Sequence, residues 1–182
     1  AVSVSLGQYH TCAILDDASL KCWGYNDYGQ LGIGSSTQQT TPQTVNLGTG
    51  RTAVSVSLGQ YHTCAILDDA SLKCWGYNNV GQLGIGSTTQ QTTPQTVNLG
   101  TGRTAVSVSL GYRHTCAILD DASLKCWGYN YYGQLGIGSS TQQTTPQTVN
   151  LGTGRTAVSV SLGQYHTCAI LDDASLKCWG YN

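Results

Sequence analysis

Residues 1–26 read AVSVSLGQYHTCAILDDASLKCWGYN, and this stretch occurs four times in the chain with at most two substitutions. Residues 29–52, GQLGIGSSTQQTTPQTVNLGTGRT, complete the first unit and recur nearly unchanged in the second and third. The period is 52 residues, and a fixed period of this length indicates a repeat architecture whose units stack on one another. We expect repeat units at residues 1–52, 53–104, 105–156 and 157–182, the last being a half unit.

Alternating apolar and polar residues predict four short strands in each unit. In the first unit they fall at residues 2–6, 10–15, 19–23 and 43–47, with a glycine-punctuated loop and a Ser/Thr/Gln-rich stretch before the last. No helical periodicity is found in the sequence. Four short antiparallel strands and many glycines per unit are typical of a β-propeller blade, so we expect an all-β fold of three and a half such blades.

The two cysteines of each unit lie ten positions apart, on either side of a predicted turn at residues 16–18. A three-residue loop at this turn places Ile14 opposite Leu20 and the two cysteines opposite each other. Directly opposed Cβ atoms lie about 4.5–5.5 Å apart, which a disulfide can bridge with little adjustment. We expect four disulfides, Cys12–Cys22, Cys64–Cys74, Cys116–Cys126 and Cys168–Cys178. Buried thiols and zinc binding are the alternatives, although zinc sites usually show closer cysteine spacing.

The sequence closely resembles the repeats of the regulator of chromosome condensation family. The resemblance rests on one set of residues that recurs in every unit, and in the first unit they are Gly7, His10, Thr11, Ala13, Leu15, Asp17, Trp23, Gly24, Asn26, Gly29, Gln30, Leu31 and Gly32. Ala18 departs from the family pattern, which has glycine there. Because the third residue of such a turn adopts the left-handed conformation, we expect mild strain at Ala18 or a different turn.

The resemblance implies a β-propeller, usually of seven blades with four strands each, that binds through loops at its rims. It does not carry over the exchange-factor activity of the nuclear member, because nothing in this chain corresponds to that protein's non-repeated residues. Three and a half units are half of a seven-bladed ring, so the units belong either to a larger ring or to an open superhelical array. The cysteine-bearing form resembles secreted or surface members of the superfamily.

Composition excludes several partners. Eight basic and nine acidic residues leave a net charge of −1, whereas a nucleic-acid-binding protein needs a basic surface. A membrane span needs about 18 or more consecutive apolar residues, and no apolar run of the sequence is that long. We expect neither nucleic-acid binding nor membrane insertion. Disulfides persist in oxidising compartments, so an extracellular or cell-surface location is expected. The chain contains no methionine, and together with the terminal half unit this favours an excerpt of a longer array.

Three sets of recurring residues have structural interpretations. His10 and its equivalents are expected to form hydrogen bonds inside the fold, because a catalytic histidine needs a unique partner and nucleophile. The recurring Trp23 is expected between blades, with an exposed sugar platform as the alternative. Asp16 and Asp17 are expected to point apart on a hairpin turn, with a calcium site as the alternative.

Two loop dipeptides differ between units, whereas the predicted strands do not. Loops on a rigid scaffold carry recognition residues, although drift at exposed positions would look the same. The candidate binding residues are Gln8, Tyr9, Asp27 and Tyr28 in the first unit, Asn79 and Val80 in the second, and Tyr112, Arg113, Tyr131 and Tyr132 in the third.

Two functions follow from these features. Near-identical units favour a structural protein that self-associates with further copies into an extracellular fibre, sheath or surface array. The alternative is a propeller module that recognises a protein or glycan through its variable loops. Because near-identical units leave little room for a unique constellation of reactive groups, we expect no enzyme activity, no cofactor and no metal site.

Overall fold

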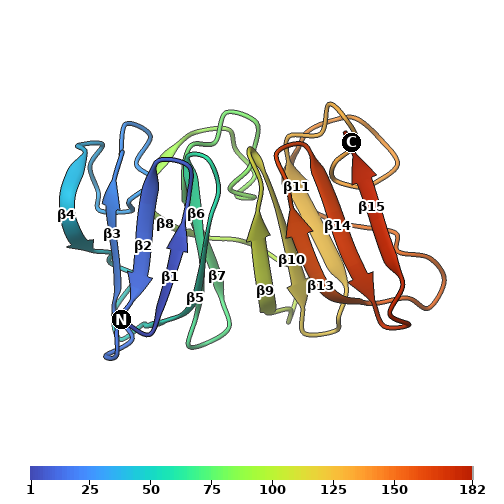
Figure 1. The fold of residues 1–182 in the computed structure, drawn as a ribbon, viewed down its shortest axis with the longest axis horizontal. Coiled ribbons are helices and arrows are strands. Elements are labelled where there is room, and N and C mark those ends of the chain that lie inside the picture. Colours follow the sequence, from blue (N-terminus) through green and yellow to red (C-terminus); the bar gives the residue numbers. More distant parts are fainter. Residues whose placement is uncertain (182) are drawn as a thin grey trace.

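The computed structural model describes residues 1–181 and consists of strands and loops without helix in that range. No segment of that range is therefore a helix able to cross a membrane. Fifteen strands form one antiparallel sheet per repeat unit, three sheets of four strands and a last sheet of three. The predicted all-β architecture of three and a half blades is confirmed (Figure 1).

The blades have equivalent strands in the same order. The first contains β1 (Ser3–Leu6), β2 (His10–Ile14), β3 (Leu20–Gly24) and β4 (Gln39–Thr44). The second contains β5 (Ala53–Leu58), β6 (His62–Leu67), β7 (Leu72–Gly76) and β8 (Gln91–Thr96). The third contains β9 (Ala105–Leu110), β10 (His114–Leu119), β11 (Leu124–Gly128) and β12 (Gln143–Thr148). The fourth contains β13 (Ala157–Leu162), β14 (His166–Leu171) and β15 (Leu176–Gly180).

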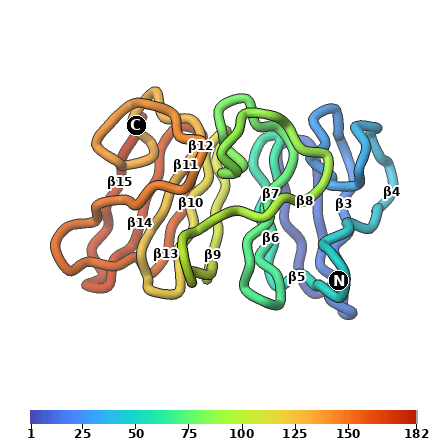
Figure 2. Tube along the Cα trace, turned by 180° about the vertical axis from the view of Figure 1, so that it is seen from behind, coloured from blue at the N-terminus to red at the C-terminus, as the bar shows by residue number. Residues whose placement is uncertain are grey.

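The blades follow one another in sequence order from the blue to the red end of the molecule (Figure 1). The first strands of successive blades, β1, β5, β9 and β13, are in contact, whereas β4, β8 and β12 form the opposite edges of their sheets. The long connection between β7 and β8 passes beyond one end of the strands (green in Figure 2). Loops between the strands therefore gather at two ends of the blade stack.

The first hairpin has the predicted register. Ile14 pairs with Leu20 and Cys12 with Cys22, and the backbone N–H of Leu15 donates to Ser19 across the three-residue loop at 2.9 Å. The equivalent cysteines pair in the other three blades, and all four disulfides have Cα atoms 4.1 Å apart. The eight cysteines are thus consumed by hairpin disulfides, as predicted.

The fourth strand lies earlier in the unit than predicted. It covers Gln39–Thr44, whereas the alternation of Val45 and Leu47 had indicated residues 43–47. Val45 and Leu47 instead lie beyond the strand and are buried in the contact with the second blade. Their alternation therefore reflects burial between blades, and the pairing with the neighbouring strand continues only as far as the N–H of Val45, which donates to the carbonyl of Leu20 at 2.9 Å.

The hydrophobic core is divided into layers between neighbouring blades. In the first layer the disulfide Cys12–Cys22, Ile14 and Leu20 of one blade pack against Leu67 and Trp75 of the next. Two further layers repeat this arrangement. Leu58, between two blades, is 7% exposed, whereas its equivalent Leu6 on the first blade is 72% exposed. Self-association through the outer faces of the first and last blades stays a prediction.

The acidic turn differs from the expectation that its two carboxylates point apart. Oδ2 of Asp68 and Oδ2 of Asp69 both approach Nη1 of Arg51, at 3.1 and 3.3 Å. The same arrangement recurs at Arg103 and Arg155. Within residues 1–181 no cluster of three or more metal-ligating side chains occurs. The paired aspartates therefore hold the turn against the preceding blade through a surface ion pair.

Candidate functional site

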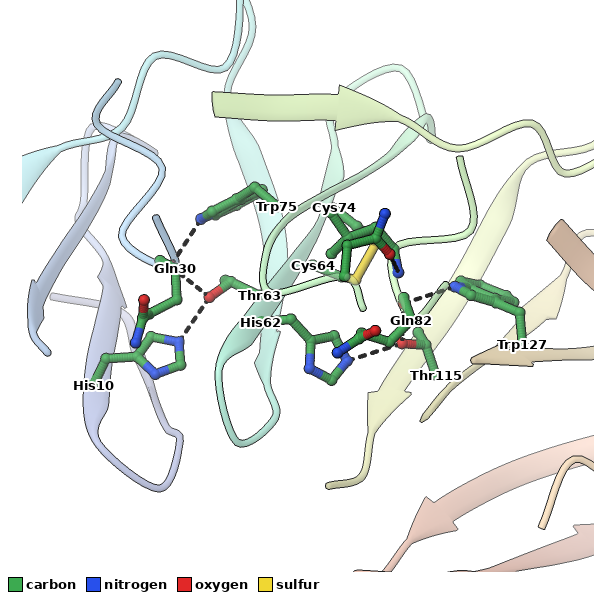
Figure 3. The surroundings of a disulfide bond; sticks show 12 residues. His10, Gln30, His62, Thr63, Cys64, Cys74, Trp75, Gln82, Thr115 and Trp127 are labelled. Atoms are coloured by element: carbon green, nitrogen blue, oxygen red, sulfur yellow. Dashed lines mark hydrogen bonds between the residues drawn. A yellow bond between two sulfur atoms is a disulfide. The ribbon is translucent and has the colours of Figure 1, made fainter. Parts of the chain in front are cut away.

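Each joint between blades contains a buried hydrogen-bond network that explains several recurring residues, and Figure 3 shows this network at the first two joints. The backbone carbonyl of Gln30 accepts bonds from Oγ1 of Thr63 at 2.8 Å and from Nε1 of Trp75 at 2.9 Å. Nε2 of His10 lies 2.7 Å from the same Thr63 oxygen. Because the Thr63 hydroxyl donates to the carbonyl, Nε2 of His10 is the donor in this contact.

Burial keeps these histidines neutral. It lowers the pKa of His10 to about 4 and that of His62 to about 3, and it is also the main cause of the low pKa of His114, about 3. Their Nδ1 atoms are buried without a hydrogen-bond partner in the described residues. Two of the tryptophans, Trp75 and Trp127, are completely buried between blades. The structural interpretation of both residue types is therefore supported.

The same network positions the loop that follows the third strand. The side-chain carbonyl of Asn26 accepts from the N–H of Leu31, and Oε1 of Gln30 accepts from the N–H of Tyr28. Gly32 has φ = 72°, and a Cβ there would lie 2.6 Å from Nε1 of Trp75. A side chain at this position would displace the tryptophan. Buried contacts at the joint therefore fix the backbone next to the variable dipeptide 27–28.

Both variable dipeptides meet at this end of the blades. The N–H of Tyr25 donates to the carbonyl of Tyr9 at 3.0 Å, and the equivalent bond recurs in the other three blades. The dipeptide 27–28 of one blade reaches the first dipeptide of the next, because the rings of Tyr28 and Tyr61 are 5.0 Å apart. The structure thus brings together two loops that are separate in the sequence.

All eleven tyrosines of the chain form one network with Arg113, which we call the tyrosine face. Its members are Tyr9, Tyr25, Tyr28, Tyr61, Tyr77, Tyr112, Arg113, Tyr129, Tyr131, Tyr132, Tyr165 and Tyr181. Their exposure ranges from half-buried to 70% at Tyr131. A continuous amphipathic surface of this kind can bind another molecule.

Aromatic contacts differ between the joints. Tyr28 packs against Tyr77 of the second blade with ring centroids 4.4 Å apart, and Tyr132 packs against Tyr181 of the fourth at 4.9 Å. The middle joint has Val80 at this position. There the guanidinium of Arg113 lies 5.2 Å from the ring centroids of both Tyr77 and Tyr112. Arg113 therefore connects the aromatic clusters on its two sides.

Three phenols of this face, those of Tyr25, Tyr61 and Tyr129, have raised pKa values and stay protonated at neutral pH. A hydrogen bond from Oη of Tyr25 to Oδ2 of Asp27, 2.7 Å long, raises the pKa of Tyr25 to about 12. Burial raises the pKa of Tyr61 and of Tyr129. Asp27, the carboxylate of the variable dipeptides, is thus occupied by its neighbour.

A groove adjoins the tyrosine face at the inner strands. It has a volume of about 420 Å³ and is lined by unit positions 6, 7 and 8 of all four blades. Position 8 is glutamine in the first, second and fourth blades and Tyr112 in the third blade. The first variable dipeptide therefore contributes its first residue to the groove and its second to the tyrosine face, and Tyr112 of the third blade belongs to both.

The predicted loop residues lie at the end of the blades that carries the tyrosine face, and their role in binding stays a prediction. They are Gln8, Tyr9, Asp27, Tyr28, Asn79, Val80, Tyr112, Arg113, Tyr131 and Tyr132. Sequence reasoning missed the tyrosine at unit position 25, such as Tyr25 and Tyr77, which does not vary between units. A signal was present, because every tyrosine falls at unit positions 8–9, 25 or 27–28.

The fold and the loops around the tyrosine face define a class of protein, a repeat β-propeller that presents loops at the ends of its blades. The model of the regulator of chromosome condensation (RCC1) repeat matches residues 20–66, 72–118 and 124–170, and a second model of that repeat matches residues 1–30, 53–82 and 105–134. The chain therefore belongs to the RCC1 repeat family, as its motifs predicted.

Relatives show the same repeats within longer proteins. The ultraviolet-B receptor UVR8 of Arabidopsis thaliana is 32% identical over 97% of this chain, which spans 40% of that protein. The E3 ubiquitin-protein ligase HERC2 of Homo sapiens is 29% identical, and the chain spans 4% of it. The yeast RCC1 protein Prp20, solved bound to Kap60, superimposes with a TM-score of 0.85 at 22% identity over 99% of this chain and 43% of that one.

Proposed function

We propose that the chain is a non-catalytic binding module that recognises protein partners through the tyrosine face. The observation that carries the proposal is the concentration of all eleven tyrosines and of both variable dipeptides on one end of the blades. Tyrosine and arginine are enriched in protein interfaces, where the large, rather rigid tyrosine ring adds contact area at low entropic cost.

The relatives support a protein partner. One is named a receptor, and the yeast RCC1 protein is solved in complex with another protein, Kap60. These names describe the relatives, and this chain spans less than half of each. They favour the binding alternative over the structural array, which these names do not support.

The outer edges of the sheets also favour binding over lateral assembly. The edge strands β4, β8 and β12 each have the sequence QTTPQT, and their register with the neighbouring strand is interrupted. Proline lacks the N–H that a further strand would need, and irregular edges discourage pairing between sheets. Growth of a fibre by edge-to-edge pairing would have to overcome both features.

A display experiment tests the proposal. Random peptides displayed on phage are selected on the immobilised chain and then measured against a variant carrying Tyr131→Asn and Tyr132→Val. These are the residues of the second unit at the same positions, so the variant is expected to fold. Selected peptides should bind it at least about tenfold more weakly, which corresponds to about 1.4 kcal/mol. Peptides that bind the variant equally well, or a chain that binds glycans on an array but no peptide, would overturn the proposal.

We also propose an extracellular or cell-surface location. All eight cysteines are paired in disulfides, and such bonds persist in oxidising compartments. Native material treated with a thiol-reactive label without reductant should remain unlabelled after denaturation. Labelling of the cysteines would contradict the proposed location.

A further inference from the structure

We propose that Arg113 recognises a carboxylate of the protein partner, and that apolar side chains next to this carboxylate pack on the neighbouring tyrosines. This inference rests on the proposed function and specifies the chemistry of the ligand. It concerns the middle joint of the tyrosine face, where the second and third blades meet.

Arg113 differs from the other arginines in its lack of an anionic partner. Arg51, Arg103 and Arg155 each approach two aspartates at 3.1–3.3 Å. Within residues 1–181 Arg113 forms no ion pair, and its Nε is buried without a hydrogen-bond acceptor. A guanidinium presents N–H groups that match a carboxylate in two-point contact, and an unpaired, partly buried cation is unfavourable. An acidic group of the partner would satisfy both requirements.

Three unit-specific residues create the surroundings of this guanidinium. Val80 occupies the position at which Tyr28 and Tyr132 fill the other joints, so the middle joint lacks that ring. Tyr112 replaces a glutamine, and together with Tyr77 it lies against the guanidinium. Contact with aromatic rings holds the cation in place without neutralising it. Variation between units has thus placed one cation in an aromatic setting at a single joint.

The charges on this rim agree with an acidic ligand. Asp27 is the one carboxylate among the two variable dipeptides of the described blades, and the hydroxyl of Tyr25 donates to it. The positions equivalent to Asp27 in the next two blades are Asn79 and Tyr131, which are uncharged. At the middle joint, therefore, no carboxylate of either dipeptide competes with a partner carboxylate for the guanidinium of Arg113. An acidic side chain flanked by proline, aromatic or aliphatic residues matches this charge and the tyrosines around it.

Two matched variants test the inference on the peptides selected above. Arg113→Gln removes the proposed contact, whereas Arg103→Gln removes the same charge from the opposite end of the blades. Arg113→Tyr serves as a second variant because tyrosine occupies this position in the other three units, so that its folding is expected. Selected peptides should contain Asp or Glu beside an apolar residue. They should bind Arg113→Gln and Arg113→Tyr about tenfold or more weakly, and Arg103→Gln with unchanged affinity.

The decisive measurement is a double-mutant cycle. Replacing the peptide's Asp by Asn should weaken binding to the parent chain about tenfold and have little effect on Arg113→Tyr. Synthetic peptides are amidated, and a free-acid version distinguishes a side-chain carboxylate from a chain-terminal one. Equal effects of the Asn peptide on both chains, or selected peptides without a carboxylate, would overturn the inference. If such peptides still lose affinity for the Tyr131→Asn/Tyr132→Val variant, the proposed function stands without it.

Discussion

The blade joints and the tyrosine face belong to the same 52-residue units, but the joint residues are identical in all units whereas residues of the tyrosine face differ between units. At the joints, the bonds among His10, Gln30, Thr63 and Trp75 recur in each pair of neighbouring blades without one substitution. At the tyrosine face, each of the first three units has its own pair of dipeptides. Buried polar groups must keep their partners, whereas exposed rings tolerate exchange. These units therefore vary where variation leaves the stacking of blades intact.

The largest expected effect is at a joint. Trp127→Ala removes a completely buried indole and leaves the carbonyl of Gln82 with one donor fewer, so it should lower the free energy of unfolding by about 3–5 kcal/mol. Tyr131→Ala, at a side chain 70% exposed, should change it by no more than about 0.5 kcal/mol. Urea unfolding followed by fluorescence gives both values. Similar losses for the two variants would remove the distinction between joint and face.

The hairpin disulfides should contribute next. Replacing both Cys64 and Cys74 by alanine should cost about 2–3 kcal/mol, because the short loop they close becomes free in the unfolded chain. The same exchange at Cys168 and Cys178 should cost less, since this pair is not buried between two blades. Thermal unfolding of the two double variants provides the comparison. An equal cost at both sites would show that burial between blades does not matter to this bond.

Acid should weaken the joints through their histidines. The folded pKa of His62 and of His114 is about 3, below the unfolded value of 6.5. The unfolded state therefore binds more protons as the pH falls below 6.5, and each buried histidine should reduce stability by about 1.4 kcal/mol per pH unit.

Urea unfolding between pH 6.5 and pH 5 measures this slope above the range in which aspartates titrate. His62→Gln should reduce the slope by the contribution of one histidine. A stability that does not change over this range would show that the joint histidines accept protons without disrupting the fold.

The smallest effect is expected at the hairpin turn. Ala70 has φ = 59°, a left-handed conformation that glycine adopts without strain, so Ala70→Gly should raise the free energy of unfolding by about 0.5–1 kcal/mol. Calorimetry of this variant against the parent chain checks the sign. A lower stability would mean that the added freedom of the unfolded chain exceeds the strain that is relieved.

Local sequence rules predicted the inner hairpins, because loop length alone sets which residues face each other. The three-residue loop at 16–18 placed Cys12 opposite Cys22, as observed. The outer strand was placed too late, since Val45 and Leu47 alternate like strand residues but are buried between blades. Gln39–Thr44 carries no apolar alternation and contains proline, which is tolerated there because the strand is an edge.

The tyrosine face was predicted only in part. Differences between units identified Tyr28 and Arg113, but a comparison of units cannot detect the tyrosine at unit position 25, such as Tyr25 and Tyr77, because it does not vary. The involvement of position 25 depends on the stacking of blades, which brings the ring of Tyr28 of one unit within 4.4 Å of the ring of Tyr77 of the next. Contacts of this kind arise from geometry between units, and no pattern within a single unit encodes them.

Hydrogen–deuterium exchange of the chain with and without a selected peptide tests the division between joint and face most directly. Protection on peptide addition should appear at residues 7–9 and 25–28 and at their equivalents in neighbouring blades. The hairpin turns at 16–18 and 68–70, at the opposite end of the strands, should exchange as before. Protection confined to those turns, or to the outer strands β4, β8 and β12, would contradict the account.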